Sequence, residues 1–500
     1  MGHEKVFPFI IYCGWNFCIF TFDKFINPPI DMECEPNKNF DIFQLVRQFE
    51  EMIQSGNEIY LDEESLQMLM DYYVDEQELV NAGKVAREAV RQYPYNLSFR
   101  IRHIELLLQT RELDLAMSSV EDALLIAPYD FEVKLLKARV MIGQKEIDEA
   151  EELLEAMKEG ADNEEISQIY FLEGLIHELL EDYEEMFESL RFSLYCNPLN
   201  EESLRKIWVA AEMINAFEES IILHNKIINE EPYSYLAWYN LGQAYSCVGN
   251  YEKALEAYEY AYLIDPKFEL GYQDRGDLLF EMGRYAEALE CYNEWYQLAG
   301  PDAEQLAQIA HCYLKLGEYD KANRLFKKAN RLDPYNDEVY YLLGQCHYAK
   351  EEYVSAIHQY HKAIRLENLR EEYYAALGSA YCRLGEFAKS HYYYQKAEEI
   401  GPEQTYIWKK HGLFLYSIGE HDEALNVLEE GIENTMDTEL MYCKAALLVK
   451  SDRIEEAMFT LEEALVEKYD GQDTFHEILS GVDLDHNIIS LLKFFAPQSG

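Results

Sequence analysis

A period of 34 residues runs through most of this chain and constrains its fold more than any other feature. The pattern Gly-x-Tyr or Gly-x-Phe begins at Gly249, Gly283, Gly317 and Gly385, and Glu351 takes the place of glycine in the gap. Proline keeps the same spacing, apart from a two-residue slip between the second and third members: Pro94, Pro128, Pro198, Pro232, Pro266, Pro334 and Pro402. A fixed period of this length is typical of a chain built from stacked structural repeats.

Each period predicts two amphipathic helices. From residue 234 onward, Trp238, Leu241 and Tyr245 recur at helical spacing, and the Gly249-Asn250 turn follows. A second apolar stripe then runs to Asp265-Pro266, where proline ends the helix because it has no amide hydrogen to donate. The second stripe contains Tyr251, Ala254, Leu255, Tyr258, Ala261 and Tyr262.

The unit that begins at Tyr235 resembles the tetratricopeptide repeat (TPR) through Trp238, Leu241, Gly242, Tyr245, Ala254, Tyr258, Ala261 and Pro266. Other units keep the phase with substitutions. We place twelve units, which start near Glu63, Leu97, Phe131, Ser167, Glu201, Tyr235, Glu269, Ala303, Asp337, Glu371, Thr405 and Thr438. The resemblance implies an all-α protein, a right-handed superhelical solenoid of about twelve TPR hairpins with capping helices at both ends.

The expected domain organisation has four parts. Residues 1–38 form an atypical hydrophobic N-terminus, 39–62 an N-terminal capping helix, 63–471 the solenoid, and 472–500 the C-terminal capping helices. Three interpretations of the hydrophobic stretch stay open. It is a signal sequence, a membrane or envelope anchor, or an annotation artefact preceding a true start at Met32.

Charge and cysteine content restrict the classes of partner and the cellular compartment that we expect. The net charge of −51 disfavours nucleic acid and anionic lipid and favours a basic protein or peptide. The charge is uneven, with 18 acidic and 6 basic residues in 131–200 but 14 and 13 in 303–400. Ten cysteines without a C-x-x-C pair indicate a reducing compartment, so a cytoplasmic protein is expected unless the N-terminal segment is a genuine anchor.

The sequence contains no motif for catalysis or cofactor binding. A phosphate-binding loop, a nucleophile elbow and zinc-ligand spacing are all missing. His358, His361 and His391 fall in adjacent units, but their helices are second helices, whose outer side faces solvent, so a metal site is disfavoured. We therefore expect no catalytic, cofactor-binding or metal-binding residues, and no enzyme.

The resemblance implies binding of partner proteins or peptides in a concave groove lined by the first helix of each unit. The candidate groove residues are non-signature positions of those helices: Tyr239, Asn240, Gln243, Gln273, Asp277, Gln308, His311, Tyr341, Gln345, Tyr348, Ser379, Lys409 and Tyr416. Tyrosine and glutamine combine contact area with hydrogen bonding, which suits an extended peptide.

The leading hypothesis for function is a non-catalytic scaffold or adaptor. No three successive units supply the Lys/Asn/Arg set that grips a C-terminal carboxylate in some TPR domains, so chaperone-tail binding of that kind is disfavoured. The alternative is a regulatory or targeting subunit of a larger assembly, associated with an envelope if the N-terminal segment is real. Self-association stays open.

Overall fold

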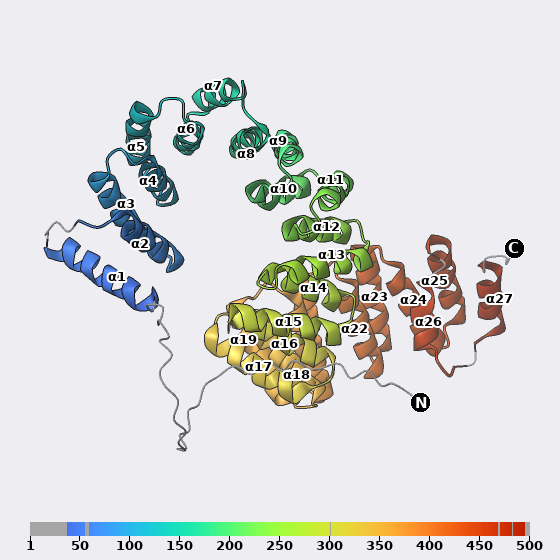
Figure 1. The fold of residues 1–500 in the computed structure, drawn as a ribbon. Coiled ribbons are helices and arrows are strands. Elements are labelled where there is room, and N and C mark those ends of the chain that lie inside the picture. The colour runs from blue at the N-terminus through green and yellow to red at the C-terminus, as the bar shows by residue number, and fades with distance from the viewer. Residues whose placement is uncertain (1–37, 56–59, 301, 469–470, 483, 496–500) are drawn as a thin grey trace, which may run out of the picture. The chain divides into compact units, whose positions relative to one another are not determined.

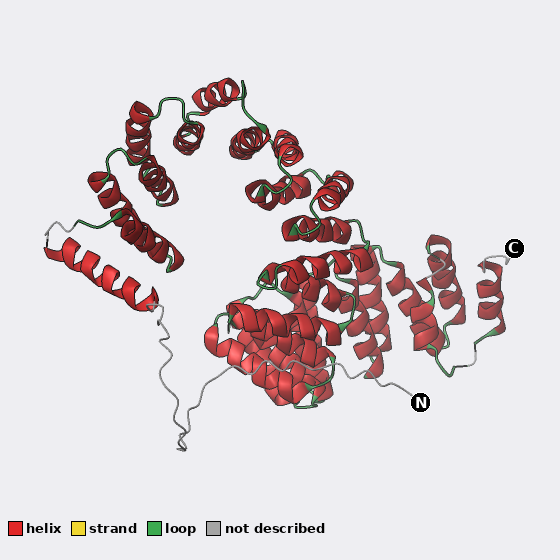
Figure 2. Cartoon of the chain, in the orientation of Figure 1, coloured by secondary structure: helices red, strands yellow, loops and turns green. Residues whose placement is uncertain are grey.

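The computed structural model describes residues 38–55, 60–300, 302–468, 471–482 and 484–495. All the regular structure in these ranges is helical, with 27 α-helices and no strand (Figure 2). The expected all-α solenoid of paired helices is therefore confirmed. The hydrophobic N-terminal stretch and the proposed start at Met32 lie outside the described residues.

Twenty-four of the helices form twelve successive antiparallel hairpins. Their first helices are α2 (Glu63–Asp75), α4 (Leu97–Gln109), α6 (Phe131–Gln144), α8 (Asn163–Leu179), α10 (Glu201–Met213), α12 (Tyr235–Cys247), α14 (Glu269–Glu281), α16 (Ala303–Lys315), α18 (Asp337–Ala349), α20 (Glu371–Arg383), α22 (Thr405–Ser417) and α24 (Thr438–Lys450). Their second helices are α3 (Leu79–Gln92), α5 (Leu113–Ile126), α7 (Ile147–Met157), α9 (Tyr183–Cys196), α11 (Phe217–Glu230), α13 (Tyr251–Ile264), α15 (Tyr285–Ala299), α17 (Tyr319–Leu332), α19 (Tyr353–Leu366), α21 (Phe387–Ile400), α23 (His421–Thr435) and α25 (Ile454–Glu467).

The chain divides into two compact units, residues 1–154 and 155–500. In the first unit, α1 (Lys38–Ser55) packs on α2, and the following helices each pack on the next as far as α6. In the second unit, consecutive helices from α8 to α25 pack on one another in the same way (Figure 1). Within each unit the core is therefore an elongated stack of hairpin interiors.

Every hairpin turns at one residue with a positive φ. In five hairpins this residue is glycine, as at Gly249, where φ is 76°. In the other seven it carries a side chain, and Glu351, with φ of 61°, occupies the place of the missing glycine in the repeated pattern. Left-handed backbone is most easily adopted by glycine, which explains the Gly-x-Tyr spacing in the central repeats.

Glycine and tyrosine bring the two helices of a hairpin into close contact. A Cβ added to Gly242 would lie 2.6 Å from the Tyr258 ring, and one added to Gly344 would lie 2.4 Å from the Tyr360 ring. Both tyrosines are buried. The tetratricopeptide pattern therefore reflects a pair of complementary sizes, with the smallest residue on the first helix and a large ring on the second.

Several of the loops between hairpins are closed by a recurring hydrogen bond. The indole Nε1 of Trp238 donates to the Pro232 carbonyl at 2.9 Å, and the indole of Trp408 donates to the Pro402 carbonyl at 2.8 Å. The Arg100 guanidinium makes the equivalent bond to Pro94 in the first unit. In each case the side chain is six residues beyond the carbonyl that it binds.

Short helices cover the C-terminal end of the stack. Phe475 of α26 (Asp473–Ile478) and Ile488 of α27 (His486–Phe495) are fully buried in the same hydrophobic cluster as Leu461 of α25. These helices shield the apolar face that the last hairpin would otherwise expose. In the described part of the chain, no helix is long and apolar enough to cross a membrane.

Candidate functional site

Four of the predicted groove residues meet in one cavity of the second unit. Tyr341, Gln345 and Tyr348 of α18 and Ser379 of α20 line a groove of about 480 Å³. We call this cavity the tyrosine groove. Its remaining lining residues are Leu314, Lys315, Tyr319, Ala349, Tyr360, Glu372, Ala375, Ala376, Tyr406 and Lys410. All but Tyr319 and Tyr360 belong to first helices, from α16 to α22.

Aromatic packing holds the walls of the tyrosine groove. The Tyr341 ring lies 5.8 Å from the Tyr360 ring and 4.9 Å from the Tyr373 ring, measured between centroids. Tyr348 packs edge-on against Tyr353 at 5.4 Å. Rings fixed in this way present apolar surface without losing further side-chain freedom when a ligand binds.

Polar atoms are placed between these rings. The Ser379 hydroxyl donates to the Ala375 carbonyl at 3.0 Å and lies 2.9 Å from the Tyr394 hydroxyl. Burial raises the pKa of the Tyr341 hydroxyl, which a hydrogen bond with Gln345 partly offsets. The Tyr341 hydroxyl is therefore neutral at pH 7 and, like the Ser379 hydroxyl, suited to hydrogen bonding.

Two charged residues of the tyrosine groove, Lys410 and Glu372, are partly desolvated. Burial lowers the pKa of Lys410, whose Nζ lies 5.2 Å from the centroid of the Tyr406 ring. Burial also raises the pKa of the Glu372 carboxyl. A groove with aromatic walls and a few oriented polar groups is the usual composition of a site that binds peptides or small molecules.

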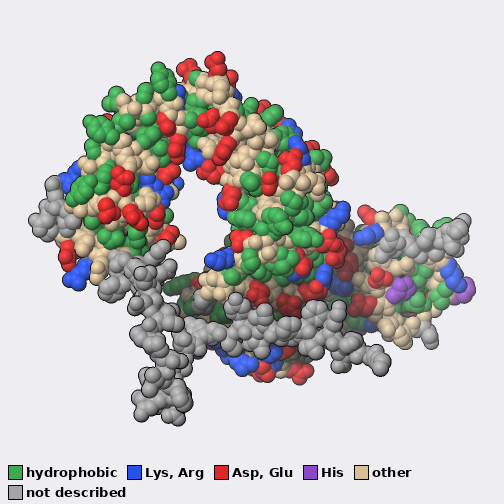
Figure 3. All heavy atoms as spheres, viewed as in Figure 1, with side chains coloured by type: hydrophobic (Ala, Val, Ile, Leu, Met, Phe, Trp, Pro, Cys, Tyr) green, Lys and Arg blue, Asp and Glu red, His purple; other side chains and the backbone are tan. Residues whose placement is uncertain are grey.

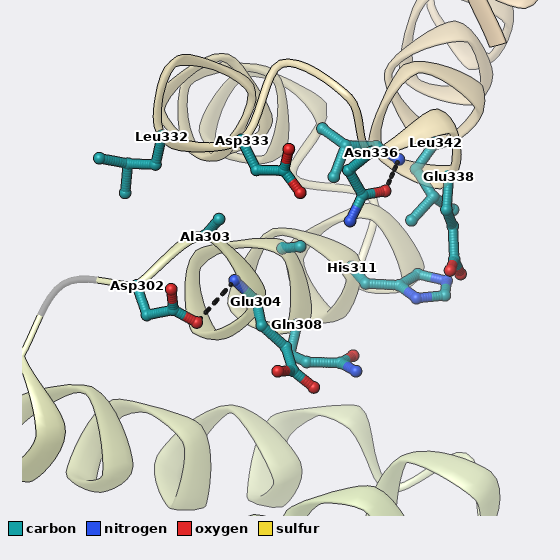
Figure 4. Close-up of a pocket in the computed structure, with 12 residues that line it drawn as sticks. Asp302, Ala303, Glu304, Gln308, His311, Leu332, Asp333, Asn336, Glu338 and Leu342 are labelled. Atoms are coloured by element: carbon teal, nitrogen blue, oxygen red, sulfur yellow. Dashed lines mark hydrogen bonds between the residues drawn. The ribbon is translucent and has the colours of Figure 1, made fainter. Parts of the chain in front are cut away.

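A second cavity of about 460 Å³ lies beside the tyrosine groove and shares α16 and α18 with it. It contains two more predicted residues, Gln308 and His311, and we call it the acidic pocket after its carboxylates, Asp302, Glu304, Asp333 and Glu338. Figure 4 shows Glu338 and His311 at one end and Asp302 and Leu332 at the other.

His311 adds no positive charge to the acidic pocket at neutral pH. Burial, with a smaller contribution from the charge of Lys315, lowers the pKa of His311 to about 4. Its ring packs on Phe280 at 4.5 Å. The acidic pocket therefore suits the basic side chain of a ligand.

Three predicted residues form polar contacts between α12, α14 and α15 instead. The Tyr239 hydroxyl donates to Asp274 at 2.7 Å and accepts from Gln243 at 3.3 Å. Asp277 accepts from the Tyr292 hydroxyl at 2.5 Å. Burial raises the pKa of both carboxyls, that of Asp274 to about 6. Gln273 also lies on α14, partly buried and outside both cavities.

The remaining predicted residues make structural contacts. Asn240 is only 2% exposed and donates to the Leu204 carbonyl at 2.7 Å, joining two hairpins. Lys409 pairs with Glu439 at 2.6 Å, and Tyr416 accepts a hydrogen bond from Ser451 at 3.3 Å. Both contacts join α22 to the last hairpin.

Sequence reasoning missed several residues of the tyrosine groove. Tyr406 and Lys410 occupy the first and second turns of α22, and Glu372 the first turn of α20. The sequence prediction used only non-signature positions of the best-matched repeats. Glu372, Tyr406 and Lys410 each lie one helical turn from a position that is equivalent to Tyr341 or Ser379 in a later repeat, so a search of all such positions would have included them.

Comparisons with known proteins agree with the repeat. Family models described as tetratricopeptide repeat match residues 107–170 and 313–381, 235–268, and 271–300. No curated protein sequence matches the chain.

Solved structures of similar fold include YrrB, a TPR protein with an unusual peptide-binding site. It is 18% identical, with 37% of this chain and 95% of that chain covered and a TM-score of 0.31. The Cut9–Hcn1 hetero-tetramer of APC/C gives 12% identity, 83% and 98% coverage and a TM-score of 0.38.

A tetratricopeptide repeat protein from Parabacteroides merdae gives 17% identity, 50% and 98% coverage and a TM-score of 0.40. Likenesses of this size carry no partner or site to this chain. The matches of the repeat models, in phase with twelve helical hairpins, establish the family, and this chain is a tetratricopeptide-repeat protein.

Proposed function

We propose that this protein is a non-catalytic scaffold whose tyrosine groove binds an extended segment of a partner protein. The observation that carries the proposal is the convergence of Tyr341, Gln345 and Tyr348 with side chains of α20 and α22 in one cavity of first helices. The groove offers apolar rings for a side chain of the partner. Gln345 and Ser379 offer hydrogen bonds for its backbone.

The acidic pocket favours a partner segment that carries a basic residue. Because α16 and α18 contribute to both cavities, one segment can place an apolar side chain in the tyrosine groove and a Lys or Arg beside Glu338. The net charge of −51 also favours the approach of a basic partner and disfavours nucleic acid. In this proposal the protein works in the cytoplasm and performs no chemistry on what it binds.

The test is a comparison of two variants in affinity capture from native lysate. Gln345→Ala combined with Tyr348→Ala removes a hydrogen-bonding group and a ring from the groove, and leaves the partly buried Tyr341 in place. We expect the captured protein to bind this variant about tenfold to thirtyfold more weakly, because interface aromatics commonly contribute about 2 kcal/mol or more.

The matched control is Tyr392→Ala, which removes an exposed tyrosine of the second helix α21. It should capture the same protein with unchanged affinity. Circular dichroism checks that both variants keep their helices. Equal capture by both variants would place binding outside the tyrosine groove and overturn the proposal.

A further inference from the structure

The acidic pocket and the tyrosine groove carry charges of opposite sign that have no partner. The four carboxylates of the acidic pocket form no ion pair with any residue that the structure describes. Those of Asp302 and Asp333 accept hydrogen bonds from backbone amides at 3.2 Å and 3.0 Å, which leave their charge in place. The acidic pocket therefore keeps its negative charge for a ligand.

The cations of the tyrosine groove lack a carboxylate partner. Lys315 and Lys410 line the groove, and neither forms an ion pair within the described part of the chain. Glu372, the single carboxylate among the lining residues, lies 3.6 Å from the guanidinium of Arg370 and is paired there. The groove therefore carries a net positive charge beside the negative charge of the acidic pocket.

Arg383 adds a third positive charge at the edge of the groove. Its guanidinium donates to the Tyr348 hydroxyl at 3.4 Å, and it too forms no ion pair in the described ranges. The chain has 94 acidic and 43 basic residues, and on the face shown in Figure 3 acidic side chains are widespread and basic ones occur in small groups. Three cations without ion pairs around one aromatic cavity therefore depart from the general charge of this protein.

Lys410 occupies the position at which a bound anion would gain most. Burial lowers its pKa, and its Nζ lies 5.2 Å from the centroid of the Tyr406 ring. Lys410 nevertheless keeps exposed surface, so a ligand in the groove can reach it. A cation that has lost part of its water and has no counter-charge is stabilised when an anion is placed beside it, because water screens their attraction less there.

We propose that the tyrosine groove binds an anionic side chain of the partner segment beside Lys410, while the acidic pocket binds a basic residue of the same segment. The proposal rests on the binding function given above and adds to it the charge pattern of the ligand. Charge complementarity selects this ligand, because the two adjoining cavities offer opposite charges. A carboxylate and a phosphate group share the chemistry that Lys410 recognises.

The arrangement also fixes the direction of the segment. The acidic pocket is built on α16 and α18, whereas Arg383 and Lys410 belong to α20 and α22. The two sides are about two helix spacings apart, or about 20 Å. An extended chain rises about 3.3 Å per residue, so the basic and the acidic residue of the segment should lie about six positions apart.

Selection of a phage-displayed library of random peptides on the full chain tests this proposal. Peptides that the unaltered chain enriches should carry one acidic and one basic residue at a fixed spacing and in one order. Selection on Lys410→Glu should remove the preference for the acidic residue and keep that for the basic one. Selection on Glu304→Gln combined with Glu338→Gln should do the reverse.

Affinities of synthetic copies of the enriched peptides make the test quantitative. Acetylated and amidated ends remove the terminal charges, so that only side chains can supply the anion. Lys410→Met should bind such a peptide about tenfold or more weakly. Alanine in place of the acidic residue of the peptide should weaken binding to the unaltered chain by the same factor and binding to Lys410→Met no further. Copies with glutamate or phosphoserine at this position identify which anion binds more tightly.

The matched control is Lys362→Met. Lys362 belongs to the second helix α19, and its Nζ lies 5.4 Å from the centroid of the Tyr340 ring, which repeats the contact between lysine and tyrosine outside both cavities. This variant should bind every peptide as the unaltered chain does.

Two results would contradict the proposal in different ways. Peptides that Gln345→Ala with Tyr348→Ala no longer binds, but that carry no acidic residue or keep their affinity for Lys410→Met, would refute the anion site and leave the binding function of the groove intact. A selection that yields no peptide dependent on Gln345 and Tyr348 would refute both.

Discussion

The first hairpin and the central hairpins solve the same packing problem in opposite ways. In the central hairpins the first helix carries glycine and the second a tyrosine sixteen residues later, as in Gly242 and Tyr258. In the first hairpin the equivalent positions hold Met70 and Ala86, both fully buried. The large residue has moved to the first helix and the small one to the second.

This inversion shows that the first hairpin keeps the pairing of a large residue with a small one and exchanges the helices that carry them. The third hairpin, with Ala138 and Leu154 at these positions, already has the central order, and both residues are buried. A sequence pattern that requires glycine at the first position and an aromatic ring at the second therefore does not match the N-terminal hairpins, although the residues at these positions are buried there too.

Met70→Ala has the largest expected effect on this comparison. It leaves two small residues facing each other and should cost about 2–5 kcal/mol of unfolding free energy, measured by urea denaturation of the full chain. Adding Ala86→Leu recreates the Ala138–Leu154 order of the third hairpin and should recover at least half of the loss. A second substitution that deepened the loss would mean that the first hairpin does not tolerate the central order.

A pH effect is expected where histidine takes the place of the large ring. His224 holds that position in the α10–α11 hairpin, is fully buried, and lies 3.2 Å from the Asn240 amide and 2.7 Å from the Ser220 carbonyl. Burial lowers its pKa to about 4 from 6.5. The unfolded chain therefore takes up the proton first, and stability present above pH 6.5 falls by about 3 kcal/mol as the pH falls to 4.

Hydrogen exchange of α10 and α11 measures this local loss. His224→Gln keeps an acceptor for Asn240 but does not titrate, so the pH dependence of these two helices should flatten. His311→Gln is the control, because the pKa of His311 is also lowered to about 4 but this residue lies in the eighth hairpin. A slope that persisted in α10 and α11 of the His224→Gln variant would assign the effect to other groups.

Gly344→Ala should have a smaller effect, with an unusual sign. Alanine in a helix interior normally stabilises by up to about 1 kcal/mol relative to glycine. Here the new Cβ would lie 2.4 Å from the buried Tyr360 ring, so overpacking should leave a net cost of about 1–3 kcal/mol, measured as a lower urea midpoint.

Gly83→Ala is the matched control in the first unit. Gly83 lies within α3, and nothing is within 4 Å of a Cβ added there. This variant should be more stable than the unaltered chain by about 0.5–1 kcal/mol. Two variants that shifted the midpoint in the same direction would contradict the size pairing as the source of the effect.

The 34-residue period predicted the fold closely because the same backbone conformation repeats from one hairpin to the next. Eleven of the twelve first helices begin at the predicted residue. The exception is α8, expected near Ser167 and found from Asn163 onward. Asp162 accepts hydrogen bonds from the amides of Glu164 and Glu165, and the Glu165 carboxylate accepts one from the Asp162 amide. This local capping box extends the helix before the periodic pattern begins.

The candidate site was harder to predict than the fold. Whether a first-helix side chain lines a cavity depends on what the next two hairpins place beside it. Tyr341 and Tyr239 hold equivalent positions, yet Tyr341 lines the tyrosine groove and Tyr239 donates to Asp274 of the next first helix. Asn240, adjacent to Tyr239, turns inward to the Leu204 carbonyl. Such differences depend on contacts between neighbouring repeats, and the sequence pattern of a single repeat does not predict those contacts.

The hydrogen bond that closes several inter-hairpin loops has a consequence for how such a sequence can diverge. Tryptophan, arginine and tyrosine all make it, as Trp238 to Pro232, Arg100 to Pro94 and Tyr374 to Asn368 show. The structural requirement is a donor of sufficient reach, and residue identity is secondary. Drift among these three side chains leaves the loop intact, so repeats can lose all visible likeness at this position while their backbones remain interchangeable.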